Sequence, residues 1–389
     1  MLNDYSHRLG VLQENFEARV SMKNEPCFSD SGWFRRYRRP VLTHEHIPLD
    51  WRYDLNPETN PHLLERLGVN AVFNTGALFW KDQVILVPRI EGHDRKSFFA
   101  VARSSSGVDR FVFDSKPLVI GETERPDTNV YDMRLVAHED GFIYGLFCSE
   151  RKDPTAPPGD TSSAEAQCGV VRTRDLETWE RLPDVKTPSP QQRNVVLHPE
   201  FVEGKYALYT RPMDAFIETG SGGGIGWGLC ESMDSPVIEK ESILDRKVYH
   251  TIKESKNGQG PAPIKTAEGW IHVAHGVRNT AAGLRYVLYL FMTDLEDPFR
   301  VIASPGGYFL APMEEERVGD VSNVAFCNGL AELPDGRVLI YYASADTRTH
   351  VAETHVELLL DYVKNTPEDP LTSAACVQQR IGLIERNKS

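Results

Sequence analysis

Short apolar segments separated by tight polar turns recur five times along the chain. In each repeat an apolar segment is followed by an acidic or glycine-containing turn and then by an aromatic-rich segment, as in YDMRLVAHEDGFIYGLFCSER. The turns lie 58, 64, 64 and 67 residues apart and are marked by Asp82, Asp140, Gly204, Glu268 and Asp335. Regular repetition of a β-hairpin unit is typical of a β-propeller. The pattern therefore predicts an all-β fold, a five-bladed β-propeller.

A further strand followed by a polar turn recurs between these hairpins. It is seen in RTRDLETWERL, CESMDSPVIEK and MTDLEDPFRVI, whose aspartates Asp175, Asp234 and Asp294 are 59 and 60 residues apart. The period exceeds the roughly 40–50 residues of common propeller repeats, so we expect long loops. The body of the chain lacks long amphipathic helices, which argues against an α/β barrel. A two-sheet sandwich does not explain the regular spacing.

The two ends of the chain differ from the repeats. An amphipathic helix is predicted over residues 3 to 18, where apolar residues recur at helical spacing: Tyr5, Leu9, Leu12 and Phe16. The tail VQQRIGLIERN has a helical pattern as well. We therefore divide the chain into an N-terminal helical extension (1–22), a propeller catalytic domain (23–366) and a C-terminal helical tail (367–389). The extensions either cover their own propeller or join the subunits of a homo-oligomer, and the sequence leaves both open.

The charge balance narrows the choice of partners. The 43 Lys and Arg against 56 Asp and Glu give a formal net charge of −13. An acidic surface repels nucleic-acid backbones and anionic lipids, so neither nucleic acid nor a membrane is expected as a partner. No apolar stretch of about 18 residues and no signal peptide is visible, and six scattered cysteines form no C-x-x-C pair. These features predict a cytoplasmic protein with reduced thiols.

Polar residues occupy matching positions in the repeats. Seven residues after the turn markers stand Arg89, Phe147, Arg211, His275 and Tyr342, and eight residues before the first two markers stand Asn74 and Asp132. Residues at equivalent positions of propeller blades should converge at one end of the central channel. Two arginines, a histidine and an aspartate gathered there would suit an anionic ligand.

Each of these residues also has a purely structural explanation. Asp132 could pair with Arg134 or close a turn, the arginines could form ion pairs between blades, and His275 could be a hydrogen-bonded core histidine. Their shared position in the repeat favours a site over four independent structural roles. His44-Glu45-His46 offers two metal ligands without an evident third, so we predict no metal site.

Five separated stretches carry a resemblance to a known family. They are FNTGA with PRIEG, YDMRL, RNVVLHPEFVEGKYALYTRP, GQGPAPIKTAEGWIHVAHGV and LIYYASADT. Over nearly its whole length, and in the same order and spacing, the chain resembles glycoside hydrolase family 130, the β-mannoside phosphorylases. The fold of that family is a five-bladed β-propeller, which agrees with the repeat count.

The resemblance implies a role for individual residues. It makes Asp132 the catalytic acid, and it assigns phosphate binding to Arg193, Arg211 and His275 and the mannosyl unit to Asn74, Arg89 and Asp346. YDMRL is similar to the branch that acts on the disaccharide 4-O-β-D-mannosyl-D-glucose. Tyr131, which we count among the substrate-binding residues, replaces a glutamate of the mannooligosaccharide branch, and Met133 replaces a proline.

These residue types favour phosphorolysis over hydrolysis. An inverting hydrolase needs an acid and a base, whereas inorganic phosphate is already an anionic nucleophile and needs a cationic pocket instead. The expected products are α-D-mannose 1-phosphate and D-glucose, formed with inversion, with phosphate as co-substrate and no cofactor. The alternatives are a β-mannoside hydrolase or a mannooligosaccharide phosphorylase of the same fold, a non-catalytic carbohydrate-binding propeller, and a protein-interaction propeller.

Overall fold

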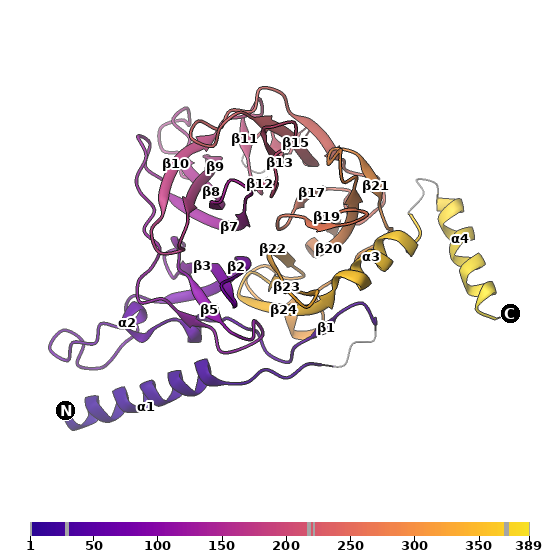
Figure 1. Ribbon diagram of the computed structural model, residues 1–389. Coiled ribbons are helices and arrows are strands. Elements are labelled where there is room, and N and C mark those ends of the chain that lie inside the picture. The colour runs from indigo at the N-terminus through magenta and orange to yellow at the C-terminus, as the bar shows by residue number, and fades with distance from the viewer. Residues whose placement is uncertain (1, 28–30, 216–218, 221, 369–372, 389) are drawn as a thin grey trace.

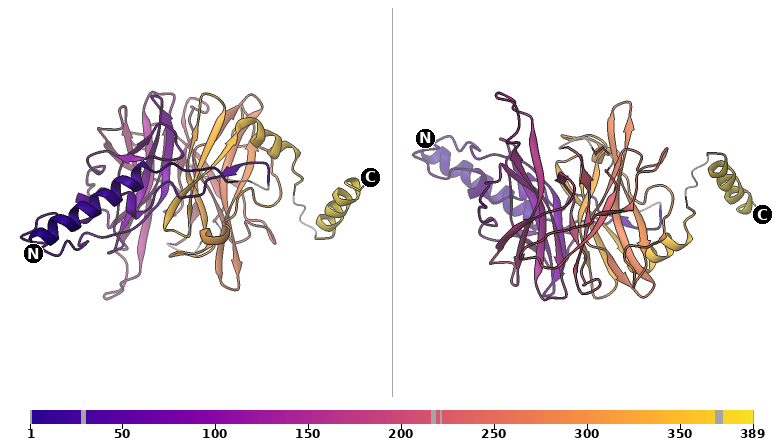
Figure 2. Two further views of the ribbon diagram at one scale, coloured as in Figure 1. Left: turned by 90° about the horizontal axis from the view of Figure 1, so that it is seen from below. Right: turned by 90° about the horizontal axis from the view of Figure 1, so that it is seen from above.

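Five antiparallel sheets stand in a ring around a central opening (Figure 1). This computed structural model describes residues 2–27, 31–215, 219–220, 222–368 and 373–388. Viewed from the side, the strands run between the two faces of the ring (Figure 2). The five-bladed β-propeller predicted from the repeats is confirmed.

Each blade has an innermost strand at the central opening and further strands paired outward from it. The first blade contains β2 (Val69–Trp80), β3 (Gln83–Gly92), β5 (Ala102–Ser104) and β6 (Val112–Phe113), with β4 (Ser97–Phe99) also paired to β3. The second contains β7 (Asn129–Ala137), β8 (Ile143–Lys152), β9 (Ala164–Thr173) and β10 (Glu180–Val185). The third contains β12 (Val196–Leu197), β13 (Tyr206–Thr210), β15 (Ile225–Cys230) and β16 (Ser242–Asp245), beside a short ladder of β11 (Gln191–Gln192) with β14 (Pro212–Met213).

The last two blades follow the same plan. In the fourth, β17 (Lys256–Gln259) and β18 (Ile264–Thr266) both pair with β19 (Gly269–Thr280), followed by β20 (Gly283–Thr293) and β21 (Val301–Ala303). The fifth contains β22 (Ala325–Glu332), β23 (Arg337–Ser344), β24 (Arg348–His355) and β1 (Arg35–Arg36). In all five blades the marker turn joins the innermost strand to the second, so the sequence repeat coincides with the structural repeat.

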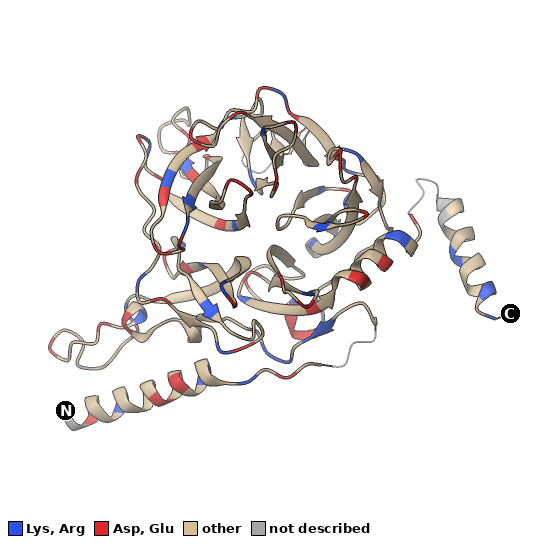
Figure 3. Cartoon of the chain, viewed as in Figure 1, with Lys and Arg blue, Asp and Glu red and all other residues tan. Residues whose placement is uncertain are grey.

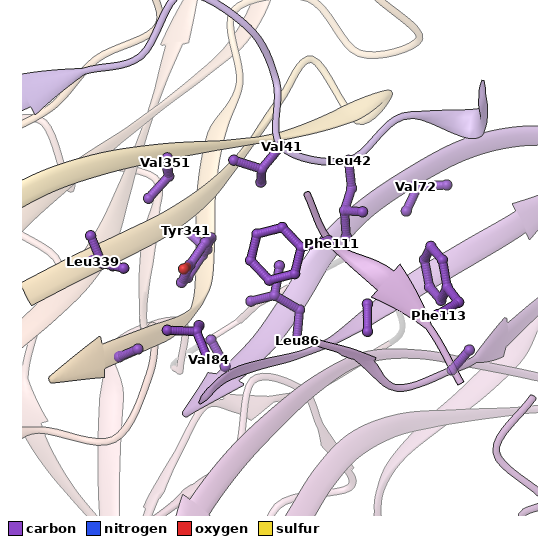
Figure 4. Close-up of a cluster of buried hydrophobic side chains, with 14 of the residues drawn as sticks. Val41, Leu42, Val72, Val84, Leu86, Phe111, Phe113, Leu339, Tyr341 and Val351 are labelled. Atoms are coloured by element: carbon purple, nitrogen blue, oxygen red, sulfur yellow. The ribbon is translucent and has the colours of Figure 1, made fainter. Parts of the chain in front are cut away.

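The ring is closed by a strand from the N-terminal part of the chain. β1 pairs antiparallel with β24, with Arg35 opposite Glu353, and becomes the outer strand of the fifth blade. A buried apolar cluster fills the seam between the first and fifth blades (Figure 4); it includes Val41, Leu42, Val72, Leu86, Phe111, Leu339, Tyr341 and Val351. Burial of each large apolar side chain contributes about 1.5–3 kcal/mol, so this seam should be among the firmest contacts of the ring.

Helices lie at both ends of the chain. They are α1 (Leu2–Ser21), α2 (Leu49–Arg52), α3 (Val356–Asn365) and α4 (Ser373–Arg386), with short 3-10 helices at His44–His46 and Glu314–Arg317. α1 is tied to the first-blade side by a hydrogen bond from the Tyr5 hydroxyl to the Leu55 carbonyl (2.8 Å), whereas α4 stands away from the ring (Figures 1 and 2). α3 was not predicted; it packs over the fourth and fifth blades through Leu359, Tyr362 and Val363.

The predicted terminal helices are present, with α1 extending to Leu2–Ser21 rather than 3–18. The division of the chain at residues 22 and 366 stays a prediction. Charged residues of both signs are distributed around the whole ring (Figure 3). No helix within the described ranges has the length and apolar character needed to cross a bilayer.

Candidate active site

A central cavity of about 340 Å³ is lined by residues from all five blades. Seven of the eight predicted site residues contribute to its wall: Asn74, Arg89, Tyr131, Asp132, Arg193, Arg211 and Asp346. The eighth, His275, lies behind the wall. The wall also contains residues that were not predicted, namely Cys148, Asn194, Lys256, Leu284, Tyr286, Val321, Val324 and Phe326.

A β-bulge brings Asp132 to the cavity. Tyr131 pairs with Cys148 and Arg134 pairs with Leu146, so two residues of β7 stand opposite one residue of β8. Asp132 has a left-handed backbone (φ 62°), and the neighbouring Met133 is fully buried between the blades. Such a bulge re-aims a side chain that regular alternation would send elsewhere. A carboxylate can therefore occupy an apolar inner strand and still face the cavity.

A β-bulge also occurs on the innermost strands of the first and fifth blades. In β2 the register shifts between Phe73 and Gly76, and Asn74 within the shift has a φ of 45°. Asn and Asp tolerate this backbone region better than most residues. Asn74 donates from Nδ2 to Asp132 Oδ1 (2.9 Å). In β22 the shift contains Asn328, whose Nδ2 donates to the Asn74 carbonyl (3.3 Å). Neighbouring bulges thus support the acid.

Arg89 is held rigidly beside Asp132. Its guanidinium lies between the rings of Phe73 and Tyr131, at 4.7 and 4.9 Å from their centroids. Nη1 is 3.6 Å from Asp132 Oδ1, and the other end of the fork pairs with Glu91. Burial alone would lower the pKa of Arg89, but the carboxylates around it raise the value, so its charge is secure.

Asp346 is the second carboxyl group of the wall. It lies in the turn between β23 and β24 with a φ of 54°. Burial, followed by the charge of Asp132, raises the pKa of Asp346 to about 7, although Arg89 acts in the opposite direction. Arg89 therefore interacts with three carboxyl groups, those of Asp132, Asp346 and Glu91, and this part of the site is rich in carboxyl groups.

Cations gather in another part of the wall: Arg193, Arg211 and Lys256. Arg211 is only 4% exposed, and its backbone N–H donates to Gln192 Oε1 (3.0 Å). Burial and the nearby charge of Arg193 lower the pKa of Arg211 to about 10. Like charges held close together in a buried place favour a bound anion, which would offset their repulsion.

His275, predicted to bind phosphate, supports the wall from the second layer. It lies on β19 and is fully buried. Its Nε2 is 3.4 Å from Asn194 Nδ2 and 3.5 Å from Arg211 Nη1. Burial, and then the charges of Arg211, Arg134 and Lys256, lower its pKa well below 6.5. The ring is therefore neutral and accepts at Nε2 from both donors, and its direct contact with phosphate stays a prediction.

Glycine permits this close approach. A Cβ atom at Gly258 would lie 2.6 Å from His275 Cε1 and 3.1 Å from Asn194 Nδ2. The contact with His275 is shorter than real Cβ atoms make and the contact with Asn194 is unusually tight, so glycine is the residue that fits beside these two side chains. The stretch GQGP in the sequence thus has a packing role beside the cations.

Residues at equivalent positions of the repeat form only part of the site. Of the five residues that follow the turn markers by seven positions, Arg89 and Arg211 reach the cavity. Phe147 packs against Phe99 (5.7 Å between centroids), and the Tyr342 hydroxyl donates to Glu316 (2.6 Å) in a separate network. Lys256 and Tyr286 belong to the fourth blade. Its innermost part is divided into β17 and β18, so these two residues have no obvious equivalents in the repeats of the other blades. Among the described residues no group of three or more His, Cys, Asp or Glu could hold a metal ion.

Comparisons with known proteins identify relatives of the chain. The chain is 59% identical over 383 residues to the 4-O-β-D-mannosyl-D-glucose phosphorylase of Bacteroides fragilis, covering 98% of both chains. It is 31% identical over 329 residues to the β-1,4-mannooligosaccharide phosphorylase of Ruminococcus albus, covering 81% of this chain and 91% of that one.

A solved structure shares the fold. The β-1,2-mannobiose phosphorylase of Listeria innocua, in complex with β-1,2-mannobiose, superposes with a TM-score of 0.66 at 20% identity, covering 85% of this chain and 98% of that one. The model of glycoside hydrolase family 130, described as β-1,4-mannooligosaccharide phosphorylase, matches residues 44–365. The chain therefore belongs to glycoside hydrolase family 130.

Proposed function

We propose that the protein catalyses phosphorolysis of 4-O-β-D-mannosyl-D-glucose to α-D-mannose 1-phosphate and D-glucose. The observation that carries the proposal is one cavity with a carboxyl-rich part around Arg89 and a cationic part around Arg211. The relative from Bacteroides fragilis, which is 59% identical over nearly its full length, supports this choice of disaccharide.

Each part of the cavity has a role in the reaction. Asp132 acts as the acid and supplies the proton that the departing glucose oxygen needs. Arg193 and Arg211 hold inorganic phosphate, which attacks the anomeric carbon from the face opposite the leaving group and so inverts its configuration. Lys256 adds a third cation to the same place. Asn74, Arg89, Tyr131 and Asp346 hold the mannosyl unit beside the acid.

The placement of the second carboxyl group supports phosphorolysis over hydrolysis. A hydrolase that inverts needs a carboxylate base on the face away from its acid, with space for a water molecule. Asp346 is instead grouped with Asp132 around Arg89, and the charge of Asp132 acts on it directly. The cavity also contains Arg193, Arg211 and Lys256, which can bind the anionic nucleophile that makes a base unnecessary. Phosphate is then the co-substrate, and the reaction requires no cofactor.

The test is incubation with mannosyl-glucose in the presence and absence of phosphate, followed by assay of mannose 1-phosphate and free mannose. We expect mannose 1-phosphate only when phosphate is present. Release of mannose without phosphate would identify a hydrolase, and sugar binding without turnover would identify a lectin. A parallel assay with β-1,4-mannotriose distinguishes the disaccharide enzyme from a mannooligosaccharide phosphorylase.

Two further assignments complete the proposal. We place the enzyme in the cytoplasm, acting without nucleic-acid or membrane partners. We also propose that the terminal helices join subunits into a homo-oligomer, because α4 stands clear of the ring and α1 has exposed apolar positions such as Val11 (44% exposed). Light scattering of the full chain and of a variant without residues 373–389 tests the role of α4 in assembly.

A further inference from the structure

A buried arginine stands two residues after the acid and takes no direct part in lining the cavity. Arg134 lies on β7 and is 2% exposed. Its three hydrogen bonds run to the Asp132 carbonyl (2.8 Å), the Gly260 carbonyl (3.1 Å) and Asn194 Oδ1 (2.7 Å). Within the described part of the chain none of its hydrogen bonds goes to a carboxylate, although the nearby charge of Asp132 partly offsets the lowering of its pKa by burial. A buried charge without a carboxylate partner costs stability, so its retention calls for a functional explanation.

The three contacts belong to three different blades. Asp132 lies in the second blade, Asn194 lies between β11 and β12 of the third, and Gly260 lies between β17 and β18 of the fourth. One guanidinium therefore connects the backbone of the acid to two segments of the cation-rich part of the site. Its planar fork suits several acceptors at once, which an ammonium group could not satisfy in the same geometry.

The contact with Asn194 decides which end of that amide faces the site. Arg134 Nη2 occupies Asn194 Oδ1, so the amide nitrogen must point the other way, where it lies 3.4 Å from His275 Nε2 and at the cavity wall. An amide NH₂ can donate to an anion, whereas an amide oxygen would repel it. Asn194 itself has a left-handed backbone (φ 56°), a conformation that asparagine tolerates better than most residues.

The contact with the Asp132 carbonyl supports the bulge that carries the acid. A left-handed backbone at a residue other than glycine costs free energy and persists only when its surroundings hold it in place. Arg134 Nη1 provides such support from within the same bulge.

We propose that Arg134 is a positioning residue that turns the Asn194 amide so that its NH₂ group donates to the bound phosphate, and that ties the acid to the same scaffold. This inference rests on the proposed phosphorolysis. Burial lowers the pKa of Arg134 to about 10, which leaves it charged at neutral pH and adds positive potential behind the phosphate site. The rival explanation is an arginine that only fills space between three blades.

Kinetics of Arg134→Met separate the two explanations. We expect the KM for phosphate to rise by about tenfold or more and kcat to fall, while the KM for the disaccharide changes by less than about twofold. Adding Asn194→Ala to Arg134→Met should raise the phosphate KM no further than Asn194→Ala alone, because the two residues act as one unit. The matched control is Arg151→Met: Arg151 is also buried in the second blade, but it pairs with Asp127 and Asp184 outside the cavity. The Arg151→Met variant should lose thermal stability without a change in the KM for phosphate.

Asn194→Asp provides a second test that does not depend on the folding of an Arg134 variant. The new carboxylate would form an ion pair with Arg134 and so raise the Tm, while its charge would raise the phosphate KM by about tenfold or more. A phosphate KM that is unchanged in Arg134→Met, or a Tm that falls in Asn194→Asp, would overturn the inference. If the wild-type protein shows no phosphorolysis, the proposed function fails instead, and the Tm of Asn194→Asp still reports on the contact with Arg134.

Discussion

Asn74 donates its side-chain amide to Asp132 across 2.9 Å, so the bulges of the first and second blades meet at the acid. Both residues have left-handed backbones, and both lie on innermost strands. Arg89 approaches the same carboxyl oxygen at 3.6 Å from a second strand of the first blade. The position of the acid is thus set by two neighbouring blades.

Replacing Asp132 by Asn should remove the acid while leaving the fold intact. Asn is nearly the same size and tolerates the left-handed backbone. We expect kcat for phosphorolysis to fall by about a thousandfold or more, with a Tm close to that of the wild type. Stopped-time assay of mannose 1-phosphate and a thermal melt check both points. Turnover close to the wild-type rate would exclude Asp132 as the acid.

Asn74→Ala should weaken catalysis through the acid. The variant loses the hydrogen bond to Asp132 Oδ1, so we expect kcat/KM for the disaccharide to fall by about tenfold to a hundredfold. Asn328→Ala is the comparison, because Asn328 occupies the matching bulge of the fifth blade and contacts Asn74 but lies outside the cavity wall. If both variants lost activity equally, the bond from Asn74 to the acid would have no special role.

Phosphate should stabilise the folded protein. Binding to the native state alone adds about 2.7 kcal/mol to the free energy of unfolding at a hundredfold excess over Kd, and occupancy should also relieve the repulsion among Arg193, Arg211 and Lys256. We expect a Tm increase of a few degrees in phosphate, measured against sodium chloride of equal ionic strength. In Arg211→Ala the increase should largely disappear and the KM for phosphate should rise. An equal increase in chloride would mean a general salt effect rather than a site.

Activity should depend on the protonation of Asp346. Its pKa of about 7 means that the carboxyl is mostly neutral below pH 7 and can donate to a mannosyl hydroxyl, whereas above pH 7 it ionises beside Asp132. We expect kcat/KM for the disaccharide to fall as pH rises through about 7, and this decline to disappear in Asp346→Asn. Asp320→Asn is the comparison: Asp320 bonds to Asn70 outside the cavity wall and its charge helps to raise the pKa of Asp346, so the decline should persist in this variant and move to lower pH. A decline that persists in Asp346→Asn would assign it to another group.

Stability should fall in mild acid because several histidines are buried in the neutral form. Burial lowers the pKa of His46, His198 and His350 to about 4. In the unfolded chain these histidines take up protons near pH 6.5, whereas in the folded protein they stay neutral until about pH 4. The free energy of unfolding is therefore undiminished above about pH 6.5 and decreases as the pH falls toward 4. Each contributes a slope of up to about 1.4 kcal/mol per pH unit.

Calorimetry between pH 4 and 8 tests this expectation. Three such groups together approach about 4 kcal/mol per pH unit, which is large against a typical total stability of about 5–15 kcal/mol. The variant His350→Gln should show a shallower decline, by roughly one of the three contributions. Equal Tm values at pH 5 and pH 7 would show that these histidines do not control the loss of stability in acid.

The sequence predicted the fold well because the signal repeats. Five hairpins in one register leave few alternatives, and the turn at Asp82 is a tight two-residue turn with positive φ at both positions, as hairpin twist requires. α3 was missed because its ten residues directly follow β24 and carry only a short apolar face. A helix of that length is recognised by what it packs against rather than by its own pattern.

The site was predicted less completely, for reasons that are also physical. Bulges shift Asn74 and Asp132 out of regular alternation, so their direction follows from backbone conformation rather than from period. Asn194, Lys256 and Tyr286 reach the cavity from segments without a common place in the repeat, and only the folded ring brings them together. Arg134 stands within YDMRL, yet its role depends on contacts with residues 60 and 126 positions away along the chain.

The closing strand has a consequence for how the protein is made. β1, with Arg35 and Arg36, leaves the ribosome long before its partner strand β24, which contains Glu353, has been synthesised. During that interval the first blade has an unfilled seam, since Leu339, Tyr341 and Val351 do not yet exist as part of the chain. Asp346 arrives equally late. A nascent chain therefore has neither a closed ring nor a finished cavity until β24 has emerged, and no fragment that ends before β24 should turn over substrate.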